Sequence, residues 1–253
     1  GTHATILTHP CQDPHMHVPS MSDDSPPGPR VVLFDLDGTL TDSAPGILAG
    51  LRFALRAMDL PEPDPVTMRT FLGPPLNVTF ADAFGLDAAQ IDEAISHYRA
   101  YYHQGGELEN SVYDGIPQVL QSMRANGVTL AVATSKPTVS ATRILEHFGL
   151  APFFAVIAGA ELDGSRQHKA DVIAYALTEL EDQGHLTVSA RNTEAVVMIG
   201  DREHDVHGAA SHGIPTIGAL WGYGSADELQ GAGAHSLVEH PHELLPALQR
   251  FTP

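Results

Sequence analysis

Two aspartates one residue apart, Asp35 and Asp37, follow the apolar run VVLF (31–34), and Gly38 comes directly after them. Taken alone, this is a strand that ends in an acidic turn, because aspartate is a common turn former. The same spacing also suits chemistry. If the extended backbone continues, both side chains lie on a similar side. One carboxylate can then attack phosphorus and the other can move protons, while glycine lets the chain turn tightly beside a ligand.

Polar side chains also follow two other apolar runs of the chain. In open parallel sheets, ligands bind at the carboxyl ends of the strands, so we expect these side chains at the same edge as Asp35. They are Thr134, Ser135 and Lys136 after TLAVAT, and Asp201 and Asp205 after AVVMIG.

Carboxylates that converge in one crevice repel each other, and burial raises their pKa values. A bound cation resolves this conflict, and ligands that offer only oxygen favour a hard ion, above all Mg²⁺. The ion also reverses the local field, which matters for a chain with a formal net charge of -18. The pattern therefore predicts Mg²⁺ as the cofactor and a small phosphorylated metabolite as the partner.

The overall charge and the cysteine count exclude several other classes of protein. With 13 Lys+Arg against 31 Asp+Glu and no basic stripe, the chain repels nucleic acid and anionic membranes, so we expect neither as a partner. One cysteine, Cys11, excludes an internal disulfide and a multi-cysteine zinc site. No apolar run approaches the ~18 residues of a membrane span, and no signal pattern is present, which favours a soluble, cytoplasmic protein. The oligomeric state is not readable from the sequence.

Short apolar runs alternate with helix-like segments along most of the chain. This alternation predicts an α/β fold, with a Rossmann-like parallel sheet and helices on both of its faces. The expected strands are 31–34, 129–134, 153–159, 195–200 and 215–220, and the expected helices are 116–126, 137–148, 168–182, 204–212 and 226–232.

Two parts of the chain depart from this alternation. Residues 1–30 are rich in Pro, His, Ser and Asp and predict a flexible tail, with Met21 as a candidate natural start. Residues 47–113 contain helical patterns but no strand pattern, and predict an inserted helical domain, the cap. The α/β core would then comprise 31–46 and 114–250. The alternative is a set of helices packed on the sheet that do not move relative to it.

The motifs resemble those of the haloacid dehalogenase superfamily, and within it the phosphoglycolate-phosphatase-like group. DLDGT after VVLF resembles the first motif, LAVATS the second, Lys169 in RQHKADVI the third, and VVMIGDREHD the fourth. FLGPPL, ATSKP and the late GALWGYGSADEL add support. The match spans about residues 31 to 250, and four motifs in this order and spacing are highly specific.

The resemblance implies a role for each acidic residue. Asp35 would be the nucleophile and a Mg²⁺ ligand. Asp37 would be the general acid and base and would bind Mg²⁺ through its backbone carbonyl. Asp201 would ligate the ion, and Asp205 would support it, through water or directly.

The resemblance also implies the residues that bind the phosphoryl group. Thr134 would donate a hydrogen bond to the oxygens of the phosphoryl group, and Lys169 would offset the charge of that group. Both residues would therefore bind the substrate and take part in catalysis. Gly38 would leave room for the group. Ser135 would contact the substrate, although a serine there equally suits the start of a helix.

The cap loop RTFLGPPL is the expected substrate-facing segment. Its residues Arg69, Phe71 and Leu72 suit either substrate contact or packing within the cap. His204 and His207 flank the fourth motif, and we interpret both as solvated helix residues.

The predicted function is Mg²⁺-dependent hydrolysis of a small phosphate monoester through an aspartyl-phosphate. Two alternatives stay open: a phosphomutase of the β-phosphoglucomutase type, which shares the core and the intermediate, and a non-catalytic binding protein on the same scaffold. The sequence does not identify the substrate among phosphoglycolate, a nucleotide, a sugar phosphate and a biosynthetic intermediate.

Overall fold

The computed structural model describes residues 1, 30–163, 165–187 and 196–251. Most of the predicted tail, with Cys11 and Met21, lies outside these residues. None of the described helices is both long and apolar enough to cross a bilayer.

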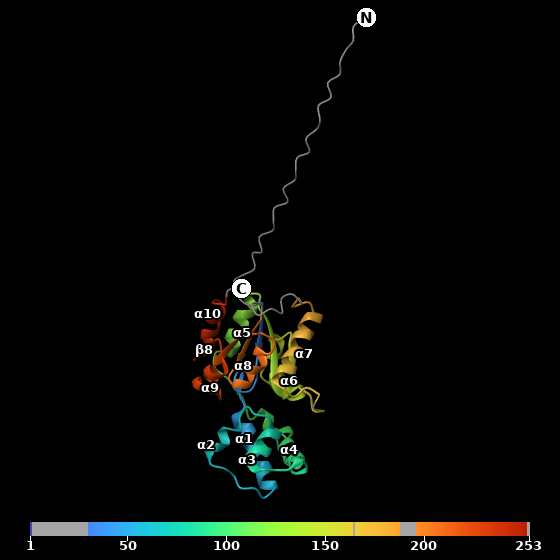
Figure 1. Ribbon diagram of the computed structural model, residues 1–253, viewed down its shortest axis with the longest axis vertical. Helices are drawn as coiled ribbons and strands as arrows, with labels where there is room; N and C mark the ends of the chain where they lie inside the picture. The colour runs from blue at the N-terminus through green and yellow to red at the C-terminus, as the bar shows by residue number, and fades with distance from the viewer. Residues whose placement is uncertain (2–29, 164, 188–195, 252–253) are drawn as a thin grey trace.

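A parallel sheet of six strands forms the centre of the molecule (Figure 1), which confirms the predicted α/β, Rossmann-like fold. The first strand, β1, pairs with β4 on one side and with β6 on the other. The strand order is β5-β4-β1-β6-β7-β8. Their bounds are Val31–Phe34 (β1), Thr129–Pro137 (β4), Val156–Ala160 (β5), Val196–Gly200 (β6), Thr216–Ala219 (β7) and Ser236–Val238 (β8).

Both faces of the sheet are buried under helices. Val32 and Phe34 of β1 pack into the apolar cluster that contains α5, α6 and α10, whereas Val31 and Leu33 pack into the cluster of α7 and α8. Alternation along a strand explains this division, and burial on both faces explains why the strand reads as a continuous apolar run. The helix bounds are Ile116–Ala125 (α5), Thr138–His147 (α6), Lys169–Asp182 (α7), Glu203–Ala210 (α8), Ala226–Ala232 (α9) and Leu244–Leu248 (α10).

Four further helices gather beyond one end of the sheet (Figure 1) and share an apolar cluster of their own. They are Ala44–Ala57 (α1), Pro65–Arg69 (α2), Leu76–Phe84 (α3) and Ala88–His103 (α4). A short antiparallel pair, Thr41–Asp42 (β2) with Ser111–Val112 (β3), lies where the chain enters and leaves this group. We call residues 44–112 the helical segment. The predicted boundary at residue 47 falls inside α1.

Short elements account for most differences from the sequence prediction. The pair β2 and β3, the strand β8, the helix α10 and the 3₁₀ turns Gly106–Leu108, Ala151–Phe153 and Pro241–Glu243 were not predicted. Each is too short to show a periodic pattern. The strand expected at 153–159 begins at Val156, because a 3₁₀ turn precedes it. Within the predicted cap, the helix α2 ends at Arg69, and Gly73 has a positive φ of 106°.

Candidate active site

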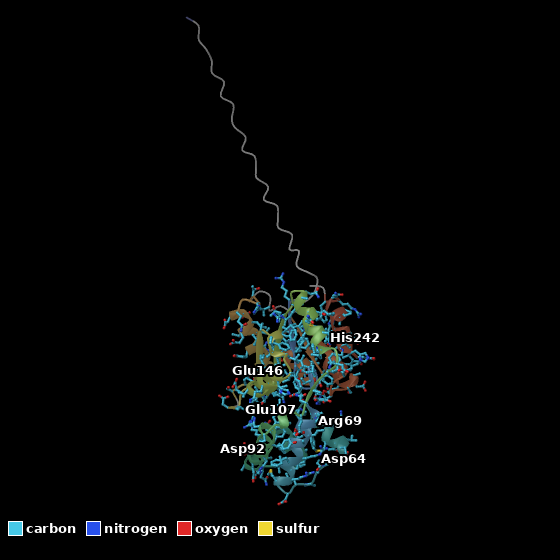
Figure 2. All side chains as sticks on the ribbon, turned by 180° about the vertical axis from the view of Figure 1, so that it is seen from behind. Asp64, Arg69, Asp92, Glu107, Glu146 and His242 are labelled. Atoms are coloured by element: carbon cyan, nitrogen blue, oxygen red, sulfur yellow. The ribbon has the colours of Figure 1, made fainter. Side chains whose placement is uncertain are left out.

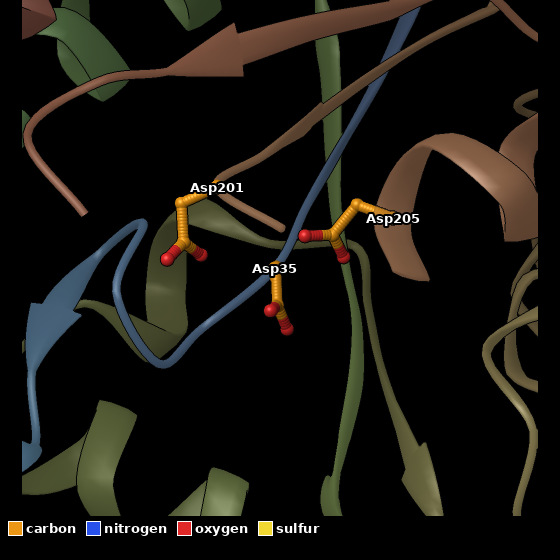
Figure 3. A group of neighbouring side chains, drawn as sticks. All are labelled: Asp35, Asp201 and Asp205. Atoms are coloured by element: carbon orange, nitrogen blue, oxygen red, sulfur yellow. The ribbon is translucent and has the colours of Figure 1, made fainter. Parts of the chain in front are cut away.

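Three carboxylates meet at the carboxyl end of the sheet (Figure 3). Asp35 directly follows β1, Asp201 directly follows β6, and Asp205 lies in the first turn of α8. Each offers one oxygen, and these oxygens all lie within 4.8 Å of one another. All three side chains are buried. Parallel strands deliver their carboxyl ends to one edge, which is why residues 166 positions apart in the chain become neighbours.

Lys169, the first residue of α7, partly balances this negative charge. Its Nζ lies 2.9 Å from Asp35 Oδ1 and 2.8 Å from Asp205 Oδ1, and it donates a third hydrogen bond to the carbonyl of Ala133 at 2.9 Å. Burial and the neighbouring Asp205 and Asp35 carboxylates raise the pKa of Asp201 well above its ordinary value. Burial likewise raises the pKa of Asp205 to about 6, although Lys169 opposes this shift. One lysine therefore leaves the cluster short of positive charge.

Asp201 is held by donors on both of its oxygens. Thr39 Oγ1 donates to Oδ1 at 3.0 Å, and the backbone N–H of Tyr223 donates to Oδ2 at 2.7 Å. Gly38 has a φ of 82°, and a Cβ there would overlap the Asp201 carboxylate. Glycine at position 38 thus lets the turn after β1 approach Asp201 closely, whereas its predicted role in substrate binding stays a prediction.

The donor set of this cluster fits a hard dication. It consists of carboxylate oxygens only, and they are buried and close together. The raised pKa values of Asp201 and Asp205 indicate that the negative charge is incompletely compensated. Oxygen ligands of this kind suit Mg²⁺ better than softer transition metals.

Asp37 is paired with a second cation, Lys136. Its Oδ2 is 2.9 Å from Lys136 Nζ, whereas its Oδ1 is buried without a hydrogen-bond partner among the described residues. Lys136 also donates to the hydroxyl of Tyr102 at 2.7 Å. Burial alone would lower the pKa of Lys136, but the Asp37 carboxylate raises it well above the ordinary value.

A cavity of about 360 Å³ opens beside these groups. Helices α3, α4 and α6 and the loop 71–75 complete its walls. Six of the predicted site residues line it, whereas Asp201 and Gly38 are not part of its lining. The six are Asp35, Asp37, Thr134, Ser135, Lys169 and Asp205.

The residues of the cap loop and the two histidines of the fourth motif differ in whether they line the cavity. Phe71 and Leu72 are both buried in the apolar cluster of the helical segment, and Phe71 also lines the cavity. Arg69 is exposed and does not line the cavity (Figure 2). His204 is half-buried and lines the cavity, which differs from the solvated position that we expected, while His207 is exposed as expected.

Sequence reasoning left four contacts of the site unassigned: those of Thr39, Lys136, Tyr102 and Tyr223. Of these four residues, only Lys136 has a feature in the sequence that could have identified it, namely the scarcity of lysine. The chain contains only two lysines, Lys136 and Lys169, and both are buried and line this cavity. The others come from a turn, α4 and the loop after β7, and no spacing rule connects those positions.

Comparisons with known proteins agree with this geometry. The family model described as Haloacid dehalogenase-like hydrolase matches residues 32–219. A protein of Mycobacterium tuberculosis named tyrosine-protein kinase PtkA is 49% identical over 205 residues, which cover 80% of this chain and 67% of that protein. A 5'-nucleotidase of Pseudomonas aeruginosa is 44% identical over 199 residues, covering 79% of this chain and 86% of that protein.

A solved structure shows the same fold along nearly the whole described chain. The crystal structure of a predicted phosphatase from Clostridium acetobutylicum superposes with a TM-score of 0.80 at 42% identity, covering 87% of this chain and 98% of the other. With the family match over residues 32–219, this establishes that the chain belongs to the haloacid dehalogenase-like hydrolases and is a phosphatase of that family.

Proposed function

We propose that this phosphatase hydrolyses a small-molecule phosphate monoester in a Mg²⁺-dependent reaction that passes through an aspartyl-phosphate on Asp35. The observation that carries the proposal is the position of Asp35. Its carboxylate lies in the cavity, 2.9 Å from Lys169 Nζ and within the carboxylate cluster.

In the first half-reaction, a carboxylate oxygen of Asp35 attacks phosphorus, and the bond between phosphorus and the leaving oxygen breaks. Asp37 donates its proton to that leaving oxygen. In the second half-reaction, Asp37 takes a proton from water, which attacks phosphorus, releases phosphate and restores the Asp35 carboxylate.

The remaining predicted residues bind and neutralise the phosphoryl group. Thr134 and Ser135 offer hydroxyl groups at the end of β4, and Lys169 brings a positive charge to the nucleophile. Asp35, Asp201, Asp205 and the backbone carbonyl of Asp37 would hold Mg²⁺. The ion would reduce the repulsion between the anionic nucleophile and the substrate phosphate.

The cavity volume and the names of the relatives guide the choice of substrates to test. A volume of about 360 Å³ leaves space for a leaving group larger than glycolate, and one relative is named a 5'-nucleotidase. A substrate panel therefore needs phosphoglycolate, 5'-nucleotides and sugar phosphates.

The test compares wild type with Asp35→Asn for phosphate release from this panel, with Mg²⁺ and with excess EDTA. We expect release by wild type with Mg²⁺, and at least about 10³-fold less by Asp35→Asn, because loss of a covalent nucleophile removes the main pathway. Asp92→Asn, an exposed carboxylate of α4, is the matched control and keeps full activity. Equal release by wild type and Asp35→Asn would contradict the proposal, and isomerisation of a sugar phosphate without phosphate release would favour the phosphomutase.

A further inference from the structure

Lys136 is the second lysine of the chain, and the reaction steps described above give it no task. Its side chain lies near the end of β4 and is only 6% exposed. Burial of an ammonium group is costly unless it is paired. Because lysine occurs at only two positions and both are buried in this cavity, the position calls for a functional explanation.

The contacts of Lys136 connect two parts of the molecule. Its Nζ donates to Asp37 Oδ2 at 2.9 Å and to the hydroxyl of Tyr102 at 2.7 Å. The ammonium group also lies 4.7 Å from the centroid of the Tyr102 ring, within the range of a cation–π contact. Asp37 belongs to the turn after β1, whereas Tyr102 belongs to α4 of the helical segment.

The two oxygens of Asp37 are therefore not equivalent. Oδ2 is engaged by Lys136, while Oδ1 is buried and has no hydrogen-bond partner among the described residues. The contact at Oδ2 restrains rotation of the carboxyl group and so fixes the orientation in which it can exchange a proton.

Tyr102 is itself firmly placed by its neighbours. Its ring stacks on that of Tyr98, one turn earlier in α4, with centroids 5.2 Å apart, and both tyrosines are buried in the cluster of the helical segment. The position of Lys136, and through it that of Asp37, thus depends on α4.

We propose that Lys136 is a positioning residue that holds Asp37 Oδ2 and so fixes the orientation of the carboxyl group that protonates the leaving oxygen, and that Tyr102 makes this alignment depend on the helical segment. The proposal rests on the proposed function, because it assigns Asp37 the proton transfer. Lys136 itself neither gains nor loses a proton in the reaction.

The test uses two substrates that differ in their need for a general acid. The oxygen of p-nitrophenyl phosphate leaves without a proton, whereas that of an alkyl phosphate from the active panel needs one. kcat/KM reports the steps up to the first irreversible one, here transfer to Asp35. For Lys136→Met we expect kcat/KM to fall about 10²-fold for the alkyl phosphate, the low end of a general-acid contribution, and less than about fivefold for p-nitrophenyl phosphate. Lys136→Arg, which retains the charge, recovers part of the loss.

A double-mutant cycle then separates positioning from direct action. If Lys136 acts through Asp37, adding Lys136→Met to Asp37→Asn lowers kcat/KM for the alkyl phosphate by no more than about twofold. Independent, multiplicative losses, or equal losses for both substrates, would overturn the proposal and point to direct contact between Lys136 and the phosphate.

Tyr102→Phe tests the link to α4 without removing a charge from the interior. Its ring can still stack on Tyr98, but the hydroxyl that accepts from Lys136 is gone. We expect kcat/KM to fall about tenfold for the alkyl phosphate and to be unchanged for p-nitrophenyl phosphate. The matched control is Tyr101→Phe, whose hydroxyl bonds Glu109 outside the cavity, and this variant keeps wild-type values.

Lysine side-chain NMR provides a readout apart from activity. Protein labelled with ¹³C-lysine gives two side-chain signals, one for each lysine. Tyr102→Phe should shift the Lys136 signal and leave the Lys169 signal in place, and absence of any shift would overturn the link. Asp35→Asn distinguishes failure of the proposed function from failure of the positioning role. If Asp35→Asn releases phosphate like wild type, the proposed function fails. If Asp35→Asn is inactive but Lys136→Met affects the alkyl phosphate and p-nitrophenyl phosphate equally, only the positioning role fails.

Discussion

Asp205 and Lys169 show how single residues depend on their surroundings. As an isolated side chain, Asp205 would simply favour the N-terminal end of its helix. In the fold it is buried, its Oδ1 pairs with Lys169 at 2.8 Å, and its Oδ2 accepts from the backbone N–H of Arg202 at 3.1 Å. Lys169 in turn uses three contacts, to Asp35, Asp205 and the carbonyl of Ala133. The protonation and contacts of each residue therefore depend on the whole cluster of charged side chains.

The pKa of Asp205 predicts how the stability of the metal-free protein varies with pH. Its pKa is about 6 in the folded protein, against an ordinary value of 3.8. Between these values the folded state binds more protons than the unfolded state, so the free energy of unfolding falls as pH rises from about 4 to 6. The loss is at most about 3 kcal/mol.

Urea denaturation in EDTA at several pH values measures this dependence. Asp205→Asn should show a shallower decline than wild type, because its side chain does not titrate. The decline should not vanish, since the pKa of Asp201 is raised in the same direction. Parallel curves for the two proteins would contradict the assignment to Asp205.

At the scale of elements, glycines set how closely the parts of the site approach. A Cβ on Gly200 would overlap the Asp205 carboxylate, one on Gly208 of α8 would overlap the Lys169 side chain, and one on Gly222 would overlap Asp201. In the helical segment, a Cβ on Gly46 of α1 would overlap the backbone carbonyl of Gly106. Glycine at these positions is explained by contact between elements.

Two glycine-to-alanine substitutions in helices should therefore have opposite effects on stability. Gly46→Ala should lower the free energy of unfolding by about 1–3 kcal/mol, because the backbone atom that it meets cannot move aside. Gly231→Ala in α9 has open space around the new Cβ and should raise it by about 0.5–1 kcal/mol through better helix propensity. Chemical denaturation of both variants measures the difference, and a gain in stability for Gly46→Ala would show that α1 packs differently.

At the scale of the whole molecule, the distribution of charge reconciles an acidic protein with an anionic substrate. The net charge is -18, yet five of the 13 Lys+Arg residues of the chain line the cavity beside the carboxylate cluster. They are Arg99, Lys136, Arg143, Lys169 and Arg202. Arg143 also bonds the buried Glu107 at 2.8 Å and so joins α6 to the helical segment, at the level marked by Glu107 in Figure 2.

Mg²⁺ should stabilise the folded protein as a whole, because binding to the native state shifts the folding equilibrium. At about 100 times its dissociation constant the ion adds about 2.7 kcal/mol, which corresponds to a rise in Tm of about 5–10 °C for a chain of this size. Asp201→Asn retains the acceptor for Thr39 and loses a carboxylate, so its Tm should respond much less.

Thermal melts with Mg²⁺ and with EDTA test this expectation, and Asp92→Asn serves again as the exposed control. The control should show the same Mg²⁺-dependent rise in Tm as wild type. An undiminished rise in Asp201→Asn would exclude that carboxylate as a ligand.

The sequence alone determined the fold class, and the reason is burial. Strands covered on both faces must be continuously apolar, so β1, β4 and β6 were recognisable, and the polar residues that follow them were expected at one edge. The acidic residues Asp35, Asp201 and Asp205 and the third-motif Lys169 indeed lie together. Local patterns sufficed because parallel topology brings the strand ends to a common edge.

Only the tertiary structure decided how the helical segment meets this edge. The contact of Lys136 with Tyr102 joins residues 34 positions apart, and that of Tyr223 with Asp201 joins residues 22 positions apart. Neither pair follows from a helix or strand period. Such contacts depend on how whole elements pack, and packing is set by side-chain volume, glycine positions and the few available charges together.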